Sequence, residues 1–564
     1  MTGHVRNAAA LLLPWFLLTA GSAAANPSEP GDWPRFRGVS GTGVADGFPT
    51  AVKWDATDPD DPAILWNVAV PGLGHSSPVI VGDRLFLLTA VPADGEASLI
   101  LGRNGNIDAA EEDEVEQTWL VLCYDKTTGE ERWRRTARTG VPRATRHAKA
   151  SHANTSVAVA GDRLVVFLGS EGLYCYDLEG TPLWERDLGV VDVRSHGAGW
   201  GYASSPAVAD GRIVLLCDAP ADPYLAAFSL EDGKELWRVS RTEVCERSWG
   251  APLIHPPEDA TTGETSCGVT PDRQIVVNGW PWIVSYDLAT GEERWRVRGG
   301  GDLPVPSPFA AEGRFFMTNA HGGPSPLIAV NHDAFGDLSA GEDKQEDAPA
   351  ADGKTDADAE TSGEEELSEE KERKTMADGG PTETDGELED GAFGTGEENE
   401  ESAERTPGPG AGLAWRTERG GSYLSTPVVY DGRLYVGATN GVFRCFDAET
   451  GQRLYQERLP GAYVVASLVA ADGKIYCPAE DGTVYVIAAT GEFELLAENP
   501  LGGACLASPA ISAGVIYFHT VDRLIAVRPA LPGAAAGPIA AENDRAEPEP
   551  ASFAATPVSV EPQN

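Results

Sequence analysis

The chain has 564 residues, 41% of them hydrophobic and 23% charged, so it is long enough to bury a large core. Lys and Arg number 43 against 87 Asp and Glu, which gives a net charge of −44 and a pI near 4.4. Such a surface repels phosphate backbones and anionic lipid headgroups, which argues against a general nucleic-acid or membrane-surface binder. Gly (64) and Pro (41) are frequent, which indicates many turns between short elements.

The first 25 residues are typical of a secretory signal peptide. A weakly basic start is followed by the apolar stretch AAALLLPWFLLTAG and by Ala23-Ala24-Ala25, which suits cleavage. No later run of 18 apolar residues follows, so we expect no membrane span. The sequence therefore predicts an exported protein, periplasmic or extracellular, that is soluble after cleavage.

One unit recurs along the chain, and it consists of a small-residue start, an apolar strand, a Gly-containing turn and a second apolar strand. The copies SSPVIVGDRLFLLTA (76–90) and STPVVYDGRLYVGA (425–438) show it most clearly. Alternating strands around such a turn are typical of a β-hairpin. The eight copies span residues 76–90, 154–169, 204–218, 250–279, 306–319, 425–438, 466–479 and 507–520.

Most copies have a second half, in which a large apolar residue stands four positions after a turn glycine, as in YDKTTGEERW (124–133). Two hairpins per unit make four short antiparallel strands, which is the composition of a β-propeller blade. The large residues are predicted to anchor the outer strands. They are Trp66, Trp133, Trp184, Trp237, Trp295 and Trp415, with Tyr455 and Leu495 in the two remaining blades.

The last copy stops after its third strand, whereas the segment AILWNVAV (63–70) supplies an unassigned strand with Trp66 near the start of the chain. Pairing the two would complete the last blade and remove an exposed sheet edge. We therefore predict an all-β, eight-bladed propeller of four-stranded antiparallel blades, in which an N-terminal strand closes the ring.

The D-x-x-T-G-x-x-x-W units resemble those of the pyrroloquinoline quinone (PQQ)-like repeat family, and DWPRFRGVSGTGV (32–44) resembles the opening segment of many exported bacterial members. The family includes quinoprotein alcohol dehydrogenases and the non-enzymatic propeller of the outer-membrane β-barrel assembly machinery, to which the resemblance is nearest. The resemblance covers residues 32–334 and 413–528 and implies the fold more specifically than the function.

The predicted organisation interrupts the propeller once. An acidic insertion stands inside blade 5, and residues 337–405 hold 26 acidic and 6 basic residues, a composition that favours disorder. The basic stretch Arg132–Lys149 is interpreted as a solvated loop or as a docking place for this insertion. The predicted segments are a signal peptide (1–25), a lead segment (26–62), blades 1–5 with the closing strand (63–334), the insertion (335–412), blades 5–8 (413–529) and a disordered Pro/Ala-rich tail (530–564).

Polar and aromatic residues cluster just before the innermost strands of blades 1 to 4, where they are predicted to surround one mouth of the ring. They are interpreted as ligand-binding candidates or as residues that fix long loops. His321, His332 and His519 are assigned no role. The candidates are His75, His152, Asn154, His196, Trp200, Tyr202, Glu246, Arg247 and Trp249.

No catalytic residue, metal ligand or cofactor is assigned from the residues themselves. The resemblance implies PQQ and Ca²⁺ for the enzymatic members, which by analogy would need vicinal cysteines and a carboxylate cluster that the sequence does not offer. Most of the eight cysteines are interpreted as small buried side chains. Cys245 and Cys267 flank one loop, and a disulfide between them is left open.

The sequence favours a non-catalytic, monomeric scaffold that binds protein partners in the cell envelope. The alternative hypothesis is a PQQ-dependent dehydrogenase that oxidises an alcohol or a sugar.

Overall fold

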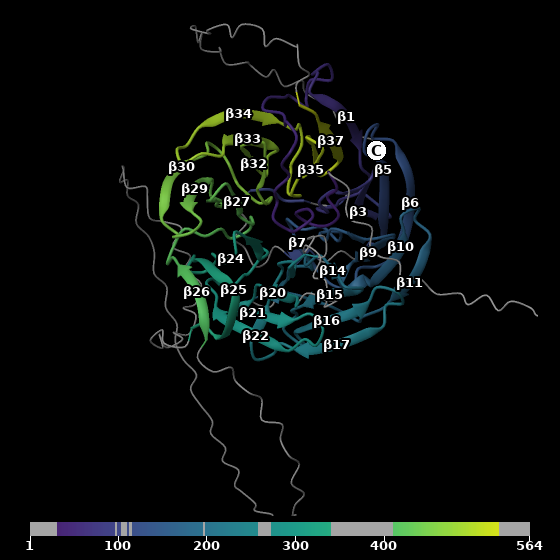
Figure 1. Ribbon diagram of the computed structural model, residues 1–564. Coiled ribbons are helices and arrows are strands. Elements are labelled where there is room, and N and C mark those ends of the chain that lie inside the picture. The colour runs from purple at the N-terminus through teal and green to yellow at the C-terminus, as the bar shows by residue number, and fades with distance from the viewer. Residues whose placement is uncertain are drawn as a thin grey trace, which may run out of the picture. The chain divides into compact units, whose positions relative to one another are not determined.

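The computed structural model describes residues 31–95, 97, 99–102, 110–111, 115–195, 198–257, 272–339 and 410–529 (Figure 1). The chain divides into two units, Met1–Pro529 and Ala530–Asn564, and the second lies outside the described residues. The described part of the first unit contains no α-helix, and its single helical turn is the 3-10 turn Gly169–Glu171.

Each blade of the first half begins with a very short inner strand and ends with an outer strand. Blade 1 holds β2 (Val79–Val81), β3 (Arg84–Pro92), β5 (Gln117–Asp125) and β6 (Glu131–Gly140). Blade 2 holds β8 (Ala158–Ala160), β9 (Arg163–Phe167), β10 (Leu173–Asp177) and β11 (Pro182–Arg186). Blade 3 holds β14 (Ala207–Ala209), β15 (Arg212–Cys217), β16 (Tyr224–Ser229) and β17 (Glu235–Ser240). Blade 4 holds β19 (Leu253–His255), β20 (Gln274–Val277), β21 (Trp280–Asp287) and β22 (Glu293–Arg298).

The second half repeats the pattern. Blade 5 holds β23 (Phe309–Ala311), β24 (Arg314–Thr318), β25 (Leu327–Asp337) and β26 (Ala411–Arg416). Blade 6 holds β27 (Val428–Tyr430), β28 (Arg433–Gly437), β29 (Val442–Asp447) and β30 (Arg453–Arg458). Blade 7 holds β31 (Val469–Ala471), β32 (Lys474–Pro478), β33 (Thr483–Ala488) and β34 (Leu495–Pro500). Blade 8 holds β35 (Ala510–Ser512), β36 (Val515–His519) and β37 (Arg523–Val527), completed by β1 (Ile64–Ala69).

The strand pairing confirms the predicted propeller. In the described residues, six blades form separate four-stranded antiparallel sheets, and blades 4 and 5 join into one nine-stranded sheet. Strand β1 pairs antiparallel with β37, with Trp66 opposite Ala526, so the predicted N-terminal strand closes the ring. Closure pairs an edge that the last hairpin of blade 8 would otherwise expose.

A belt of hydroxyl groups joins the inner strands around the ring. In seven of the eight junctions the backbone N–H at the start of one blade donates to the Ser or Thr hydroxyl of its neighbour, as from Ser77 to Ser156 at 2.9 Å. Seven of the eight positions carry the hydroxyl, and Ala251 in blade 4 is the exception. The accepting hydroxyls belong to Ser77, Ser156, Ser205, Ser307, Thr426, Ser467 and Ser508.

The outer-strand tryptophans dock on the next blade. The Nε1 of Trp133 donates to the carbonyl of Leu178 at 3.2 Å, and the ring lies against Gly180, where a Cβ would meet the indole at 2.9 Å. This close approach, together with a positive φ, is why glycine stands at the turn. Trp66, Trp184, Trp237 and Trp415 make the same hydrogen bond to the carbonyls of Lys126, Leu230, Leu288 and Ala448.

Trp295 departs from this pattern because blade 5 lacks the turn on which it would dock. Its Nε1 donates instead to Oε1 of Gln274 within its own blade, at 3.0 Å. Strand β25 continues past the blade to Asp337, and its end pairs in parallel with β22, with Trp295 opposite Gly336. Within the described residues, Phe335 of β25 pairs with Ala411 of β26.

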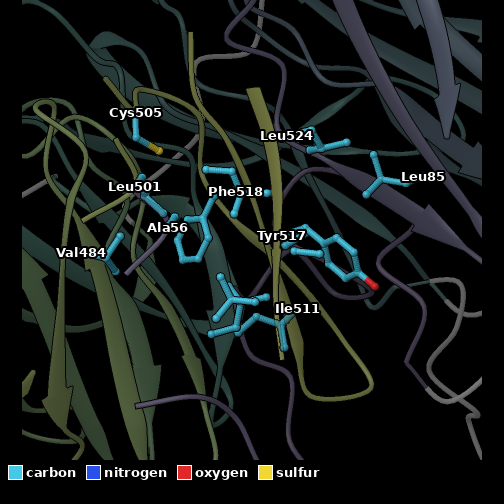
Figure 2. Packing of buried hydrophobic residues seen from close by; sticks show 14 of the residues in the cluster. Ala56, Leu85, Val484, Leu501, Cys505, Ile511, Tyr517, Phe518 and Leu524 are labelled. Carbon is cyan, nitrogen blue, oxygen red and sulfur yellow. The ribbon is translucent and has the colours of Figure 1, made fainter. Parts of the chain in front are cut away.

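The N-terminal segment lies against the inner strands of several blades. Trp33 exchanges backbone hydrogen bonds with Ile80 of β2, Val159 of β8 donates to the carbonyl of Pro34, and Ala470 of β31 donates to Gly43. Further along, this segment packs with blades 7, 8 and 1 in the largest apolar cluster, where Ala56 lies beside Phe518 and Leu501 (Figure 2).

Arg37 fixes the N-terminal segment at its centre. Its buried guanidinium donates to the carbonyls of Thr42 (2.8 Å), Pro427 (2.7 Å) and Leu468 (2.9 Å), which belong to the segment itself and to blades 6 and 7. Burial lowers the pKa of Arg37 to about 9. Because carbonyl oxygens satisfy its donors, this side chain is part of the packing that holds the segment in the ring.

The cysteines of the described residues are buried and unpaired. Cys245 lies with its Sγ 3.0 Å from Oδ2 of Asp218, and burial raises its pKa. Cys267, for which the sequence leaves a disulfide with Cys245 open, lies outside the described residues, as do the predicted signal peptide, most of the acidic insertion and the tail.

Candidate functional site

The predicted site residues share one face of the ring because successive strands of each blade run in opposite directions. Loops that lead into an innermost strand and loops between the second and third strands lie on the same side of a four-stranded antiparallel blade. We call this side the mouth face. Of the eight predicted residues that the structure describes, six lie in loops of the mouth face, and Glu246 and Arg247 lie in the short strand β18 (Cys245–Arg247) that precedes the inner strand of blade 4. His196 lies outside the described residues.

In the loop that leads into blade 2, the predicted residues hold the backbone. Oδ1 of Asn154 accepts from the backbone N–H (2.8 Å) and the hydroxyl (2.9 Å) of Ser151, and its Nδ2 donates to the carbonyl of Tyr202. The carbonyl of His152 accepts from Nε1 of Trp119 at 2.9 Å. These contacts favour the structural interpretation for both residues.

The aromatic candidates pack against one another. Trp200 lies between His147 (ring centroids 5.1 Å apart) and Trp249 (6.1 Å), and Nε1 of Trp249 donates to the carbonyl of Gly201. The hydroxyl of Tyr202 donates to the carbonyl of Leu216, and burial raises its pKa well above the usual value. This cluster joins the loops that lead into blades 2, 3 and 4.

His75 and Lys149 begin a connection that crosses the mouth face. Nε2 of His75 donates to the carbonyl of Lys149 at 2.9 Å, and burial lowers the pKa of His75 to about 4. Nζ of Lys149 in turn lies 2.5 Å from Oε1 of Glu480, in blade 7, and 4.2 Å from the centre of the Tyr463 ring. The loop that leads into blade 2 is thereby held to blade 7, and blades 1 and 8 stand between these two blades in the ring.

Glu480 also holds a second loop, because its Oε2 accepts from the backbone N–H of Gly102 at 2.8 Å. Gly102 belongs to the long connection between β3 and β5, whose short strand β4 (Ala110–Glu111) pairs with β7 (Arg146–His147). Burial lowers the pKa of Lys149, although the hydrogen bond and charge of Glu480 oppose the shift. The loop before blade 2 and the connection between β3 and β5 therefore both contact Glu480. The sequence could not predict these contacts, since 331 residues separate Lys149 from Glu480.

Arg247 stands beside a second pair that sequence reasoning missed. Nδ1 of His321 lies 2.6 Å from Oδ1 of Asp302, and Nη1 of Arg247 lies 3.9 Å from Oδ2 of the same carboxylate. Burial raises the pKa of Asp302, but the hydrogen bond and charge of His321 outweigh it, and the net shift is downward. Glu246 accepts from Arg247 at 2.8 Å and is more than half exposed.

This Asp302–His321 pair faces solvent in part, and the His321 ring lies 4.7 Å from that of Tyr423. The only signals in the sequence are the glycines around the two residues, in GGGD (299–302) and HGG (321–323). They matter because a Cβ at Gly301 would collide with the backbone of His321.

The basic stretch Arg132–Lys149 is neutralised locally. Arg132 contacts Asp83 and Asp125 at 2.6 and 2.5 Å, Arg134 contacts Glu131 at 2.5 Å, and Arg143 contacts Asp187 at 2.9 Å. These local ion pairs offset part of the positive charge of the stretch.

The sequence matches the family described as outer membrane protein assembly factor BamB, over residues 117–266, 222–334 and 408–534. The chain belongs to this family. The matched ranges cover more than half of its length and comprise most of the blades from β5 onward. No curated protein matches the sequence.

Solved structures similar to this BamB-family chain include another BamB and two dehydrogenases. BamB from Moraxella catarrhalis is 11% identical, with a TM-score of 0.47, over 84% of this chain and 99% of that one. A europium-containing methanol dehydrogenase is 12% identical, with a TM-score of 0.49, over 88% and 90%. Quinohemoprotein alcohol dehydrogenase from Comamonas testosteroni is 11% identical, with a TM-score of 0.47, over 89% and 81%.

The mouth face of this family member does not fit PQQ with Ca²⁺. Of the carboxylates described on this face, Glu480 is held by Lys149 and the N–H of Gly102, and Asp302 by His321 and Arg247, whereas Ca²⁺ takes six to eight oxygen ligands. In the part of the chain that the structure describes, no three His, Cys, Asp or Glu side chains gather as a metal site. Among the same residues, no helix is long and apolar enough to cross a membrane.

Proposed function

We propose that this protein is an exported, non-catalytic scaffold of the cell envelope that binds protein partners through its mouth face. The proposal rests on the family assignment and on one observation, a set of exposed apolar side chains on that face. Each is between 40% and 55% exposed, and together they are called the mouth apolar group: Ile100, Leu101, Val115, Val141 and Val190.

The mouth apolar group belongs to loops that contact one another. The backbone N–H of Ile100 donates to the carbonyl of Ala148, and Arg143 contacts Asp187, which ties the loop of Val141 to the loop of Val190. Exposed apolar side chains that are gathered on one face and rimmed by charged groups are typical of protein interaction sites.

Affinity capture from envelope extracts tests the proposal. We expect the full chain to retain specific protein partners, and the double variant Val141→Lys/Val190→Lys to lose them. Phe48→Lys/Leu454→Lys is the matched control, since both side chains are similarly exposed but lie outside the mouth apolar group. Equal partner sets from the two variants would overturn the proposal.

The dehydrogenase alternative has its own readout. Purified protein is mixed with PQQ and Ca²⁺, and absorbance, thermal shift and dye-linked alcohol oxidation are followed. We expect no stoichiometric complex and no turnover. A tight complex that turns over an alcohol would replace the scaffold with an enzyme.

A further inference from the structure

The outer edge of blade 4 is occupied by a strand of the chain itself. The end of β25 runs parallel to β22, with Trp295 opposite Gly336 and Arg296 opposite Asp337. The backbone N–H of Leu338 donates to the carbonyl of Arg296 at 2.9 Å, and the backbone N–H of Arg298 donates to Oγ of Ser339 at 2.8 Å. The end of β25 therefore adds a short strand to the edge of a complete blade, with Gly336 at a positive φ of 73° and a turn at Leu338 and Ser339.

The outer strand of blade 3 has nearly the same sequence as that occupied edge. Strand β17 reads ELWRVS and β22 reads ERWRVR. Both carry an ion pair at the same positions, Arg238 with Glu235 at 2.7 Å and Arg296 with Glu293 at 2.6 Å. In both, the arginine also stacks on an aromatic residue at the start of the third strand, Tyr224 or Trp282.

The two edges differ in what covers them. In the described part of the chain, no strand pairs with the outer side of β17, which ends its sheet. Along β22, five of the six positions are more buried than their counterparts in β17. For example, Trp295 is fully buried whereas Trp237 is partly exposed, and Leu236 is 49% exposed.

We infer that the outer edge of β17 binds a short segment of a protein partner by parallel strand addition, in the conformation in which residues 335–339 bind β22. Such addition supplies backbone hydrogen bonds, and alternate side chains supply specificity. The inference adds a second contact surface to the proposed scaffold, away from the mouth face.

The register of the occupied edge defines the chemistry of this partner segment. Position 335 would stand opposite Leu236 and should be apolar, because apolar pairs on adjacent strands stabilise a sheet. Position 337 would stand opposite Arg238 and should be acidic, since Asp337 stands opposite Arg296 at the equivalent place and opposite charges on adjacent strands stabilise a sheet. The segment should therefore read apolar–Gly–acidic–apolar, with no proline.

A labelled peptide tests the inference on the full-length protein. The probe is AFGDLS, residues 334–339 of this chain, carrying fluorescein at its N-terminus, and anisotropy is followed up to about 1 mM peptide, the weak end of specific binding. We expect saturable binding that Arg238→Glu and Leu236→Glu each weaken about tenfold or more. Leu454→Glu in β30 is the control, because it changes an equally exposed outer-strand leucine where Gln456 replaces the arginine.

A change in the peptide checks the backbone contacts without altering the protein. Methylation of the peptide nitrogen at the position of Leu338 removes the N–H that would donate to Arg238, and we expect about tenfold weaker binding. A photoreactive group at the position of Phe335 should crosslink to β17.

Several outcomes would overturn the inference. They are no binding at the highest concentration, equal binding to the Arg238→Glu and Leu236→Glu variants, crosslinks to other blades, or a dimer of the protein that the peptide dissociates. The last would make a second copy the occupant. Since the probe is synthetic, its failure leaves the capture experiment on the mouth face untouched, and failure of that capture leaves peptide binding untouched.

Discussion

The backbone N–H of Ser508 donates to Oγ of Ser77 at 3.1 Å, across 431 residues of sequence. This hydrogen bond joins the last blade to the first and closes the belt of hydroxyl groups around the inner strands. A ring can close in this way only if every blade contributes one position to the belt. The belt positions therefore mark both the repeated blades and the junction that closes the ring.

Loss of a belt hydroxyl should destabilise the ring. Ser77→Ala leaves the buried N–H of Ser508 without this acceptor, and we expect the free energy of unfolding to fall by about 1–3 kcal/mol. The converse change is Ala251→Ser, which supplies the one missing hydroxyl and should not destabilise the protein. Urea unfolding of both variants checks this, and equal losses would show that the belt hydrogen bonds do not contribute.

The ion pair between Lys149 and Glu480 should stabilise the contact between the loop before blade 2 and blade 7. Both side chains are largely buried, so Glu480→Ala leaves an unpaired lysine and should cost about 3–5 kcal/mol. We expect faster hydrogen exchange at residues 141–156. The double variant Lys149→Met/Glu480→Leu removes both charges and should recover most of the loss. If the single and double variants unfold alike, the charges are not what holds the loops.

The turn glycines beneath the tryptophans should be more sensitive than glycines in open turns. A Cβ at Gly129 would approach the Trp66 ring to 2.7 Å, whereas a Cβ at Gly161 meets nothing within 4 Å, and both residues have positive φ. Gly161→Ala should lose about 1 kcal/mol from backbone strain alone. Gly129→Ala should lose about 1–3 kcal/mol more through overpacking. Thermal unfolding measures the difference, and equal losses would argue against docking of Trp66.

Acid should destabilise the protein through its buried histidines. Nδ1 of His519 donates to the carbonyl of Ser76 at 2.8 Å, and burial lowers its pKa to about 4, as it does for His75 and His255. Between pH 6.5 and 4 the unfolded chain therefore binds more protons, so stability is lost as pH falls through this window.

The histidine contribution can be isolated by substitution. A lowering of this size corresponds to about 3 kcal/mol for a fully buried histidine such as His519. Replacing it by glutamine should flatten the pH dependence of unfolding between pH 6.5 and 4. An unchanged slope in His519→Gln would show that other groups set the acid limit.

The blades could be predicted from the sequence because each repeats local signals: alternating strands, glycine turns and one large apolar residue per outer strand, a tryptophan in six of the eight. Trp66 was predictable as an anchor since the last blade visibly lacks its fourth strand. The contact of Trp295 with Gln274 was not predicted, although its cause is in the sequence. The insertion replaces one turn in blade 5, and this turn is where Trp295 of blade 4 would otherwise dock.

The contacts of the mouth face were predictable only in part. Residues just before the inner strands could be placed on one face by topology. Their partners could not, because Asp302, His321 and Glu480 stand in loops whose path no periodicity encodes. Asn154 and Trp249 turned out to hold loops, whereas the polar pair nearest to Arg247 comes from a blade outside the predicted cluster.

The central claim is that the mouth face binds protein partners, and site-specific photocrosslinking in intact cells tests it most directly. A photoreactive residue is placed at position 141, on the mouth face, or at position 162, in the Gly-Asp turn on the opposite face of blade 2. The account predicts discrete protein adducts from position 141 and none of these from position 162. Identical adducts from both positions, or none from position 141, would contradict it.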